Sequence, residues 1–233
     1  MPDDEPVWDA LLSALRAGRP TLLGLTGSVA AGKTTFAQEI ARRLTERHVE
    51  IVGTDGFLLP TATLAERGLL ERKGFPESYD LLRLTGFLDD VRANRPAVAP
   101  RYSHATYDPL PEAFGQSVHQ PDLLIVEGVN ALQPELIPFY DATLYLDAAE
   151  NDLFAWYAAR LARLREEARS DPSAYLHRLS RLSDEEFQGR IAHIWEETNL
   201  KNLREHIAPT KPFADLIVAK DRNHRLESFD DTR

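Results

Sequence analysis

The chain has 233 residues and a net charge of −10, from 27 basic and 37 acidic side chains. This balance excludes a protein that coats nucleic acid or an anionic membrane through bulk charge, although a local basic pocket is compatible with it. The chain contains no cysteine, which excludes disulfides, thiolate catalysis and cysteine-based zinc sites. Its length suits one domain over residues 1–233. No apolar run approaches membrane-spanning length and no signal-peptide pattern opens the chain, so we expect a cytoplasmic protein.

The predicted elements alternate between helices and strands. The first is an amphipathic N-terminal helix within residues 1–19. Short apolar runs typical of strands lie at residues 21–26, 49–54, 123–126, 142–146 and 216–219. Helical spacing lies between them, at residues 35–44, 79–91, 151–169 and 183–206, the last opened by a capping-box pattern at Ser183 and Glu186. Residues 95–121 hold five prolines and no clear period, so we expect a long excursion over the sheet. The alternation predicts an α/β fold with a mostly parallel sheet and helices on both faces.

The strongest motif lies between the first strand and the helix that follows it. It has the pattern G-x-x-x-x-G-K-T and comprises Gly27, Ser28, Val29, Ala30, Ala31, Gly32, Lys33 and Thr34. In this P-loop pattern the two glycines let the backbone turn tightly, so that its N–H groups surround phosphate oxygens. Lys33 adds a positive charge for the β- and γ-phosphates, and the hydroxyl of Thr34 can bind Mg²⁺. The dipole of the following helix also favours an anion there, so the motif predicts a nucleotide site.

Two carboxylates follow predicted strands. Asp55 ends the second strand and Glu127 ends the buried strand at residues 123–126. Because the carboxyl ends of parallel strands meet at the ligand crevice, we expect both to face the phosphate site with Lys33. Asp55 can accept the proton of an attacking hydroxyl, and Glu127 can hold Mg²⁺ directly or through water. The alternatives are a turn residue before Gly56 for Asp55 and a salt bridge for Glu127.

Two observations narrow the class of P-loop protein. The guanine-reading pattern Asn-Lys-x-Asp and the pattern Asp-x-x-Gly of GTPases do not occur. The predicted helix at residues 151–169 carries Arg160, Arg163, Arg165 and Arg169. Most of these should be solvated surface charges, but one of them can fold over the γ-phosphate and offset charge in the transition state.

Further stretches form a set that is specific in combination. They are Thr54-Asp55-Gly56-Phe57-Leu58, Glu66-Arg67-Gly68-Leu69, Lys73-Gly74-Phe75-Pro76-Glu77-Ser78-Tyr79-Asp80, Tyr102-Ser103-His104 with Tyr107-Asp108, Glu127-Gly128-Val129-Asn130, Trp156-Tyr157 with Arg160, Trp195 with Asn199, and Asn223-His224. With them, the chain from about residue 20 almost to its end resembles the bacterial type I pantothenate kinases. That family lies within the wider group of P-loop kinases that holds uridine kinase and phosphoribulokinase.

The resemblance implies a three-layer P-loop fold of the kinase type, with residues 151–206 as a helical lid and substrate region. It implies ATP-dependent phosphorylation of the primary hydroxyl of pantothenate, on the way to coenzyme A. ATP and Mg²⁺ would be the cofactors and a small molecule the partner, with neither nucleic acid nor membrane involved; a homodimer is left open as the assembly.

The resemblance also implies roles for individual residues. The catalytic residues would be Asp55, Lys33 and Arg160. The nucleotide site would comprise residues Gly27 to Thr34, with Thr35 and, over the adenine, His224. The acceptor site would comprise Asp55, Tyr102, His104, Tyr157 and Asn199. The metal ligands would be Thr34 and Glu127.

One departure from the family pattern concerns the acceptor pocket. Leucines stand where these kinases tend to carry aromatic side chains, at Leu161, Leu164, Leu176 and Leu179. A pocket of this kind stays apolar but loses flat surfaces. Two other hypotheses therefore stay open: a kinase of the same group that acts on a nucleoside or a sugar, and a protein that binds a nucleotide or coenzyme A without turnover. Binding alone does not require Asp55 and Arg160 together, which favours an enzyme.

Overall fold

A central twisted sheet organises the protein. The computed structural model describes residues 4–170 and 177–233. Within this part of the chain the main sheet has six strands in the order β10-β9-β8-β1-β7-β2. Their bounds are Leu22–Gly27 for β1, Val49–Gly53 for β2, Leu123–Glu127 for β7, Ala142–Ala148 for β8, Leu216–Lys220 for β9 and Leu226–Asp231 for β10. Strands β1, β2, β7, β8 and β9 pair in parallel, which confirms the predicted α/β sheet.

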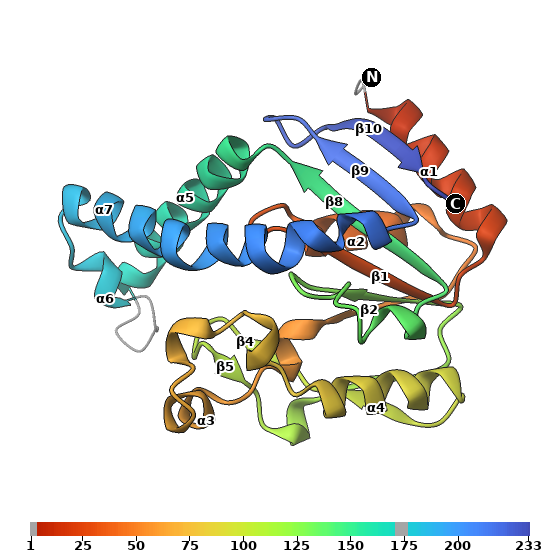
Figure 1. Ribbon diagram of the computed structural model, residues 1–233, viewed down its shortest axis with the longest axis horizontal. Coiled ribbons are helices and arrows are strands. Elements are labelled where there is room, and N and C mark those ends of the chain that lie inside the picture. Colours follow the sequence, from red (N-terminus) through yellow and green to blue (C-terminus); the bar gives the residue numbers. More distant parts are fainter. Residues whose placement is uncertain (1–3, 171–176) are drawn as a thin grey trace.

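The sheet differs from the prediction at one edge. The expected last strand is present as β9, but the chain then turns and adds β10, which pairs antiparallel with β9. In Figure 1 the helix α1 (Glu5–Gly18) lies alongside β10, so the first and last elements of the chain are neighbours.

Helices cover both faces of the sheet, as predicted. Helix α2 (Lys33–Arg43) follows the P-loop, and α4 (Leu81–Arg92) and α5 (Glu150–Glu167) follow later strands. Helix α7 (Asp184–Ile194) begins at the predicted capping box, in which Ser183 and Glu186 bond to each other's backbone N–H groups. Its path continues through two wider, π-helical stretches as far as Ile207, and Figure 1 shows it crossing in front of the sheet. Two short helices, α3 (Thr61–Glu66) and α6 (His177–Ser180), complete the set.

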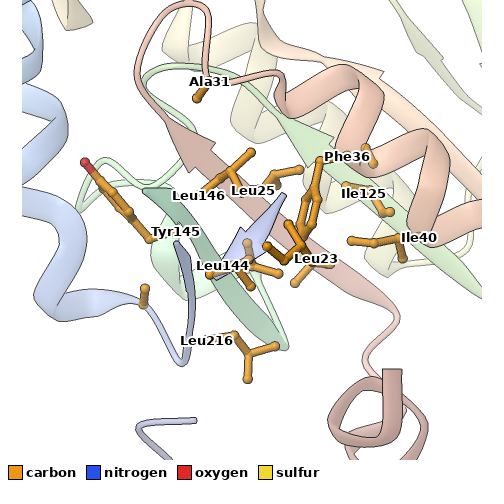
Figure 2. Packing of buried hydrophobic residues seen from close by; sticks show 14 of the residues in the cluster. Leu23, Leu25, Ala31, Phe36, Ile40, Ile125, Leu144, Tyr145, Leu146 and Leu216 are labelled. Carbon is orange, nitrogen blue, oxygen red and sulfur yellow. The ribbon is translucent and has the colours of Figure 1, made fainter. Parts of the chain in front are cut away.

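The core follows from the alternation of side chains along the buried strands. On β7, Leu123 and Ile125 join a cluster with Phe36 of α2, whereas Leu124 and Val126 join a second cluster that includes the buried side of α4. Figure 2 shows side chains of α2 packed against those of β1, β7 and β8. A strand that is apolar on both faces in this way belongs in the middle of a parallel sheet.

The proline-rich stretch at residues 95–121 is more ordered than expected. It contains two small antiparallel ribbons, one from β3 (Ala97–Ala99) and β6 (Gln116–Val118), the other from β4 (Tyr102–Ser103) and β5 (Asp108–Pro109). The segment carries Tyr102 and His104 to the cavity that the P-loop residues also line. Among the described helices, none has the length and apolar character needed to cross a membrane.

Candidate active site

The P-loop joins β1 to α2 in a tight backbone turn. Gly32 has a φ of +82°, and a side chain on Gly27 would come within 2.4 Å of the Leu146 carbonyl oxygen, so both positions require glycine. Lys33 is buried, and its Nζ donates to the carbonyl oxygens of Gly27 and Ser28 at 3.1 and 3.0 Å. Burial lowers the pKa of Lys33, while the nearby carboxylates of the site oppose that shift. The lysine is therefore a charge held within the loop itself.

The loop opens into a cavity of about 1080 Å³ at the carboxyl ends of the strands. Residues from the sequence predictions that line it are Val29, Ala30, Gly32, Lys33, Thr34, Thr35, Asp55, Tyr102, His104, Glu127, Arg160 and His224. They come from the P-loop, from the ends of β2 and β7, from the ribbon β4–β5, from α5 and from the turn after β9. This is the ligand crevice that a parallel sheet of this type forms.

Thr34 and Glu127 form a pair of oxygen donors within this cavity. The hydroxyl of Thr34 donates to Glu127 Oε1 at 2.6 Å. Burial raises the pKa of Glu127, against the opposing effects of Lys33 and of the Thr34 hydroxyl. Mg²⁺ prefers oxygen ligands and keeps several waters, so one hydroxyl and one carboxylate beside a phosphate site fit it. The described residues hold no cluster of three or more carboxylates, histidines or cysteines that would form an all-protein metal cage.

Asp55 lies in a short 3₁₀ turn, Thr54–Phe57, directly after β2. The turn packs closely: a side chain on Gly56 would come within 1.9 Å of the Pro100 carbonyl oxygen. The hydroxyl of Tyr79 donates to Asp55 Oδ1 at 3.5 Å, and burial raises the pKa of Tyr79 well above its usual value. The phenol thus stays a neutral donor and holds one oxygen of Asp55.

The arginines of α5 separate by their contacts. Arg160 and Arg163 line the cavity. Arg165 instead pairs with Asp184 at 2.8 Å and donates to backbone carbonyls, and Arg169 pairs with Glu166 at 3.1 Å on the surface. Arg160 is therefore one of two candidates from this helix for contact with a phosphate.

His224 lies at the side of the cavity, in the turn between β9 and β10. Its ring stacks on Trp156 of α5 with centroids 4.0 Å apart, and Trp156 Nε1 donates to the Arg222 carbonyl oxygen at 3.1 Å. Burial and the charge of Lys220 lower the pKa of His224, so the ring is neutral near pH 7. A neutral flat ring of this kind suits a stacking contact.

Two predicted acceptor residues do not line the cavity. Tyr157 is buried against Trp195, with ring centroids 5.4 Å apart. Burial raises its pKa to about 12, against the effect of its hydrogen bond with Asn199. Tyr102 and His104, by contrast, line the cavity and meet edge to face at 5.2 Å. The structure thus brings Tyr102 and His104 together on the cavity wall. Tyr157 and Asn199 do not line the cavity, but Tyr157 lies close enough to Arg160 and Tyr107 for both to act on its pKa.

The leucines that replace aromatic side chains of the family pattern differ in how deeply they are buried. Leu161 and Leu164 are half-buried on α5 and Leu179 is buried on α6, whereas Leu176 lies outside the described residues.

Sequence reasoning missed three polar residues near the site. Tyr79 and Lys73 lay within a motif that was recognised but received no role. The Nζ of Lys73 donates to Thr61 Oγ1 at 2.8 Å and pairs with Asp108 at 3.6 Å. Burial lowers the pKa of Lys73, and the charges of Asp108 and Asp55 oppose that shift. Lys220 ends β9 and donates to the P-loop. No local pattern marks such a residue, because the contact spans 189 positions.

Comparison with known proteins agrees with this geometry. A family model described as the phosphoribulokinase/uridine kinase family matches residues 22–167. A protein of Rhizobium rhizogenes named pantothenate kinase is 44% identical over 91% of this chain and 68% of its own length. One of Rhodopseudomonas palustris with the same name is 45% identical over 93% of this chain and 73% of its own. The crystal structure of phosphoribulokinase from Rhodobacter spheroides shares the fold, with a TM-score of 0.56 at 13% identity over 87% of this chain and 70% of the other. The chain belongs to the phosphoribulokinase/uridine kinase family of P-loop kinases, and curated relatives that match most of it are named pantothenate kinase.

Proposed function

We propose that the chain is a single-domain pantothenate kinase, which transfers the γ-phosphoryl group of ATP to the primary hydroxyl of pantothenate. The observation that carries this proposal is the convergence of Lys33, Asp55, Glu127 and Arg160 on one cavity, in a chain whose curated relatives bear that name. The reaction uses ATP and consumes a small hydrophilic acid, which fits a cytoplasmic enzyme.

The nucleotide half of the site rests on the P-loop. The backbone N–H groups of residues 28–34 and the Lys33 ammonium hold the β- and γ-phosphates. Thr34 and Glu127 would hold Mg²⁺, which would offset the charge of the phosphate oxygens. The stacked pair of His224 and Trp156 lies where it can support the adenine ring.

The acceptor half of the site rests on Asp55. Its carboxylate accepts the proton of the acceptor hydroxyl while that oxygen attacks the γ-phosphorus; the bond from the γ-phosphorus to the bridging oxygen breaks and ADP leaves. Arg160 neutralises charge that develops on the transferring group. Most of the rate enhancement would come from positioning and charge stabilisation, since phosphoryl transfer needs little covalent help from the protein.

The identity of the acceptor is set by the residues around Asp55. Tyr102 and His104 offer an aromatic edge and a polar tip on the cavity wall. We assign Tyr157 and Asn199 to the far end of the acceptor site, beside Arg160, whose charge acts on the pKa of Tyr157. Leucines on α5 and α6 stand where the family pattern has further aromatic side chains, although Leu161, Leu164 and Leu179 do not line the cavity. We expect weak discrimination among pantothenate analogues extended toward them.

A coupled assay of ADP release with pantothenate, uridine, cytidine and a hexose as acceptors tests the proposal. We expect turnover with pantothenate and little with the others. Turnover of a nucleoside or sugar with none of pantothenate would assign the chain to another kinase of the same family. Nucleotide binding without turnover of any acceptor would indicate a binding protein.

A further inference from the structure

A second buried lysine, Lys220, forms a hydrogen bond with the backbone of the P-loop. Lys220 is the last residue of β9 and only 9% of it is exposed. Its Nζ donates to the Ala31 carbonyl oxygen at 3.0 Å and lies 5.8 Å from the centre of the Phe36 ring. A side chain on Gly32 would come within 3.2 Å of the same nitrogen. The lysine therefore touches the P-loop where it enters α2.

Burying the Lys220 ammonium near Lys33 destabilises the protein when no ligand is bound. Burial, followed by the charge of Lys33, lowers its pKa to about 8. Two buried ammonium groups close enough to affect each other destabilise the loop unless an anion joins them. An unbranched apolar side chain would fill the same space beside Phe36 without this repulsion. The cost thus points to a role in anion binding rather than in packing.

The hydrogen bond to Ala31 has a directional effect on the loop. A trans peptide is planar, so its carbonyl oxygen and the N–H of the next residue point to opposite sides. Gly32 lines the main cavity, whereas Ala31 and Lys220 do not, so Lys220 holds the Ala31 oxygen on the side away from the cavity. The N–H of Gly32 is thereby turned to the inner side of the loop. In a P-loop that inner side is where the N–H groups meet phosphate oxygens.

We propose that Lys220 is a positioning residue for nucleotide binding, which orients the Ala31–Gly32 peptide toward the phosphates and adds a second positive charge behind the loop. This inference rests on the proposed function, because it takes the ligand of the loop to be the polyphosphate of ATP.

Three variants test the role. Lys220→Met keeps the length of the side chain but removes donor and charge, Lys220→Arg keeps both, and Lys201→Met removes an exposed lysine of the helical stretch after α7 as a matched control. Calorimetric titration with ATP, ADP and adenosine, each with Mg²⁺, gives the Kd values. We expect Lys220→Met to weaken ATP and ADP on the order of tenfold or more, as a charge-assisted hydrogen bond contributes, with adenosine almost unchanged. Lys220→Arg should restore most of the loss.

The pH dependence gives a readout that packing alone would not move. Wild-type affinity for ATP should be highest below pH 8 and fall as Lys220 loses its proton, whereas Lys220→Arg should lack this step. The charged and titratable groups around Lys220 are Lys33 of α2, His224 of the turn after β9, and those that line a neighbouring cavity together with it: Asp147, Asp152, Asp221, Arg222 and Glu227. These groups are the same in both proteins, so the difference between the two profiles belongs to position 220.

Two outcomes would overturn the inference. One is an ATP Kd in Lys220→Met equal to that of wild type; the other is equal weakening of ATP and adenosine, which would mean a general loss of structure. A melting curve for each variant detects the latter independently. Failure of the proposed function looks different, since the wild-type protein itself would then bind no ATP or phosphorylate no acceptor.

Discussion

At the scale of single residues, Asp55 separates an enzyme from a binding protein. Asp55→Asn keeps the size of the side chain and its hydrogen bond with Tyr79 but removes the proton acceptor. General-base catalysis contributes roughly 10²–10⁴-fold, and the loose transition state of phosphoryl transfer favours the lower half of that range. We expect kcat to fall accordingly while the Kd for an ATP analogue hardly changes, or improves slightly as a negative charge is lost. If kcat stays at the wild-type value, Asp55 is a turn residue.

Arg160 is tested by the balance between kcat and KM. An arginine that stabilises charge in the transition state contributes little to the binding of ground-state ATP. Arg160→Ala should therefore lower kcat more than it raises the KM for ATP. Arg169→Ala is the matched control, because Arg169 lies on the surface with Glu166. A change confined to KM would make Arg160 a nucleotide contact only, and activity equal to that of the control would make it a surface charge.

Glu127 links the metal requirement to pH. Its pKa is raised, mainly by burial, and Mg²⁺ binds the deprotonated carboxylate. Protons therefore compete with Mg²⁺ at a higher pH than for an ordinary glutamate. We expect the Mg²⁺ concentration for half-maximal activity to rise as pH falls toward that raised pKa. Glu127→Gln should need more Mg²⁺ at every pH and lose this dependence; an unchanged requirement would assign Glu127 to a structural hydrogen bond with Thr34.

At the scale of elements, the side chain of Arg43 on α2 binds two residues of α1. It makes two 2.8 Å hydrogen bonds to Glu5, pairs with Glu39 of its own helix, and lies 4.7 Å from the centre of the Trp8 ring. Arg43→Met should lower the free energy of unfolding by about 1–2 kcal/mol, from a charge network and a cation–π contact. Arg95→Met, which breaks an exposed pair with Asp90 away from α1 and α2, should change it by only a few tenths. Urea unfolding measures the free energy of unfolding of both variants. Equal effects would mean that the contacts of Arg43 with α1 do not stabilise the protein.

The same network gives a pH signature. Hydrogen bonds from Arg42 and then from Arg43 lower the pKa of Glu39 from 4.5 to about 2, and the hydrogen bonds from Arg43 also lower the pKa of Glu5. A lowered pKa in the folded state means that the stabilisation is fully present above the unfolded value and is lost as pH falls through the folded one. The stability difference between wild type and Arg43→Met should therefore shrink between about pH 4.5 and 2. A difference that is constant across this range would exclude Glu5 and Glu39 as its source.

Most elements could be predicted from the sequence because their signals are local. Strand β7 is a continuous apolar run up to Glu127, β1 and β8 are mostly apolar, and Ser183 with Glu186 marks the start of α7. Strand β10 was missed because an exposed edge strand needs few apolar residues. Its only apolar residues are Leu226 and Phe229. The ribbons at residues 95–121 were missed because their strands are two or three residues long and lie among prolines.

The residues of the candidate site likewise fall into those that local sequence signals indicate and those that only the fold brings together. Asp55 and Glu127 could be placed because they directly follow or end neighbouring parallel strands, whose carboxyl ends meet at the crevice. The contacts of Tyr79 with Asp55 and of Lys220 with Ala31 could not, since they join segments that only the fold brings together. The separation of Arg160 from Arg165 likewise depends on where α5 meets α7, which helical periodicity does not contain.

At the scale of the whole molecule, nucleotide binding should raise thermal stability. A ligand that binds only the folded state at 100 times its Kd adds about 2.7 kcal/mol. For a chain of this length that corresponds to a rise in Tm of roughly 5–10 °C. Lys33→Met, chosen because Lys33 is buried and an unbranched side chain fills its space, should fold but lose both this rise and turnover. Differential scanning fluorimetry with and without ATP and Mg²⁺ measures it, and a normal rise in the variant would contradict the P-loop assignment.

The edges of the sheet bear on how the protein behaves at high concentration. The antiparallel strand β10 ends the sheet, and the outer backbone groups of such a strand can in other proteins template the addition of a further chain. In this protein helix α1 lies alongside β10. Here the strand carries exposed Glu227, Asp230 and Asp231, so a second copy would bring like charges together. At the opposite edge the Gln116 amide donates to the Ile51 carbonyl oxygen at 3.2 Å and occupies β2. The sheet is thus protected at both ends against growth into aggregates.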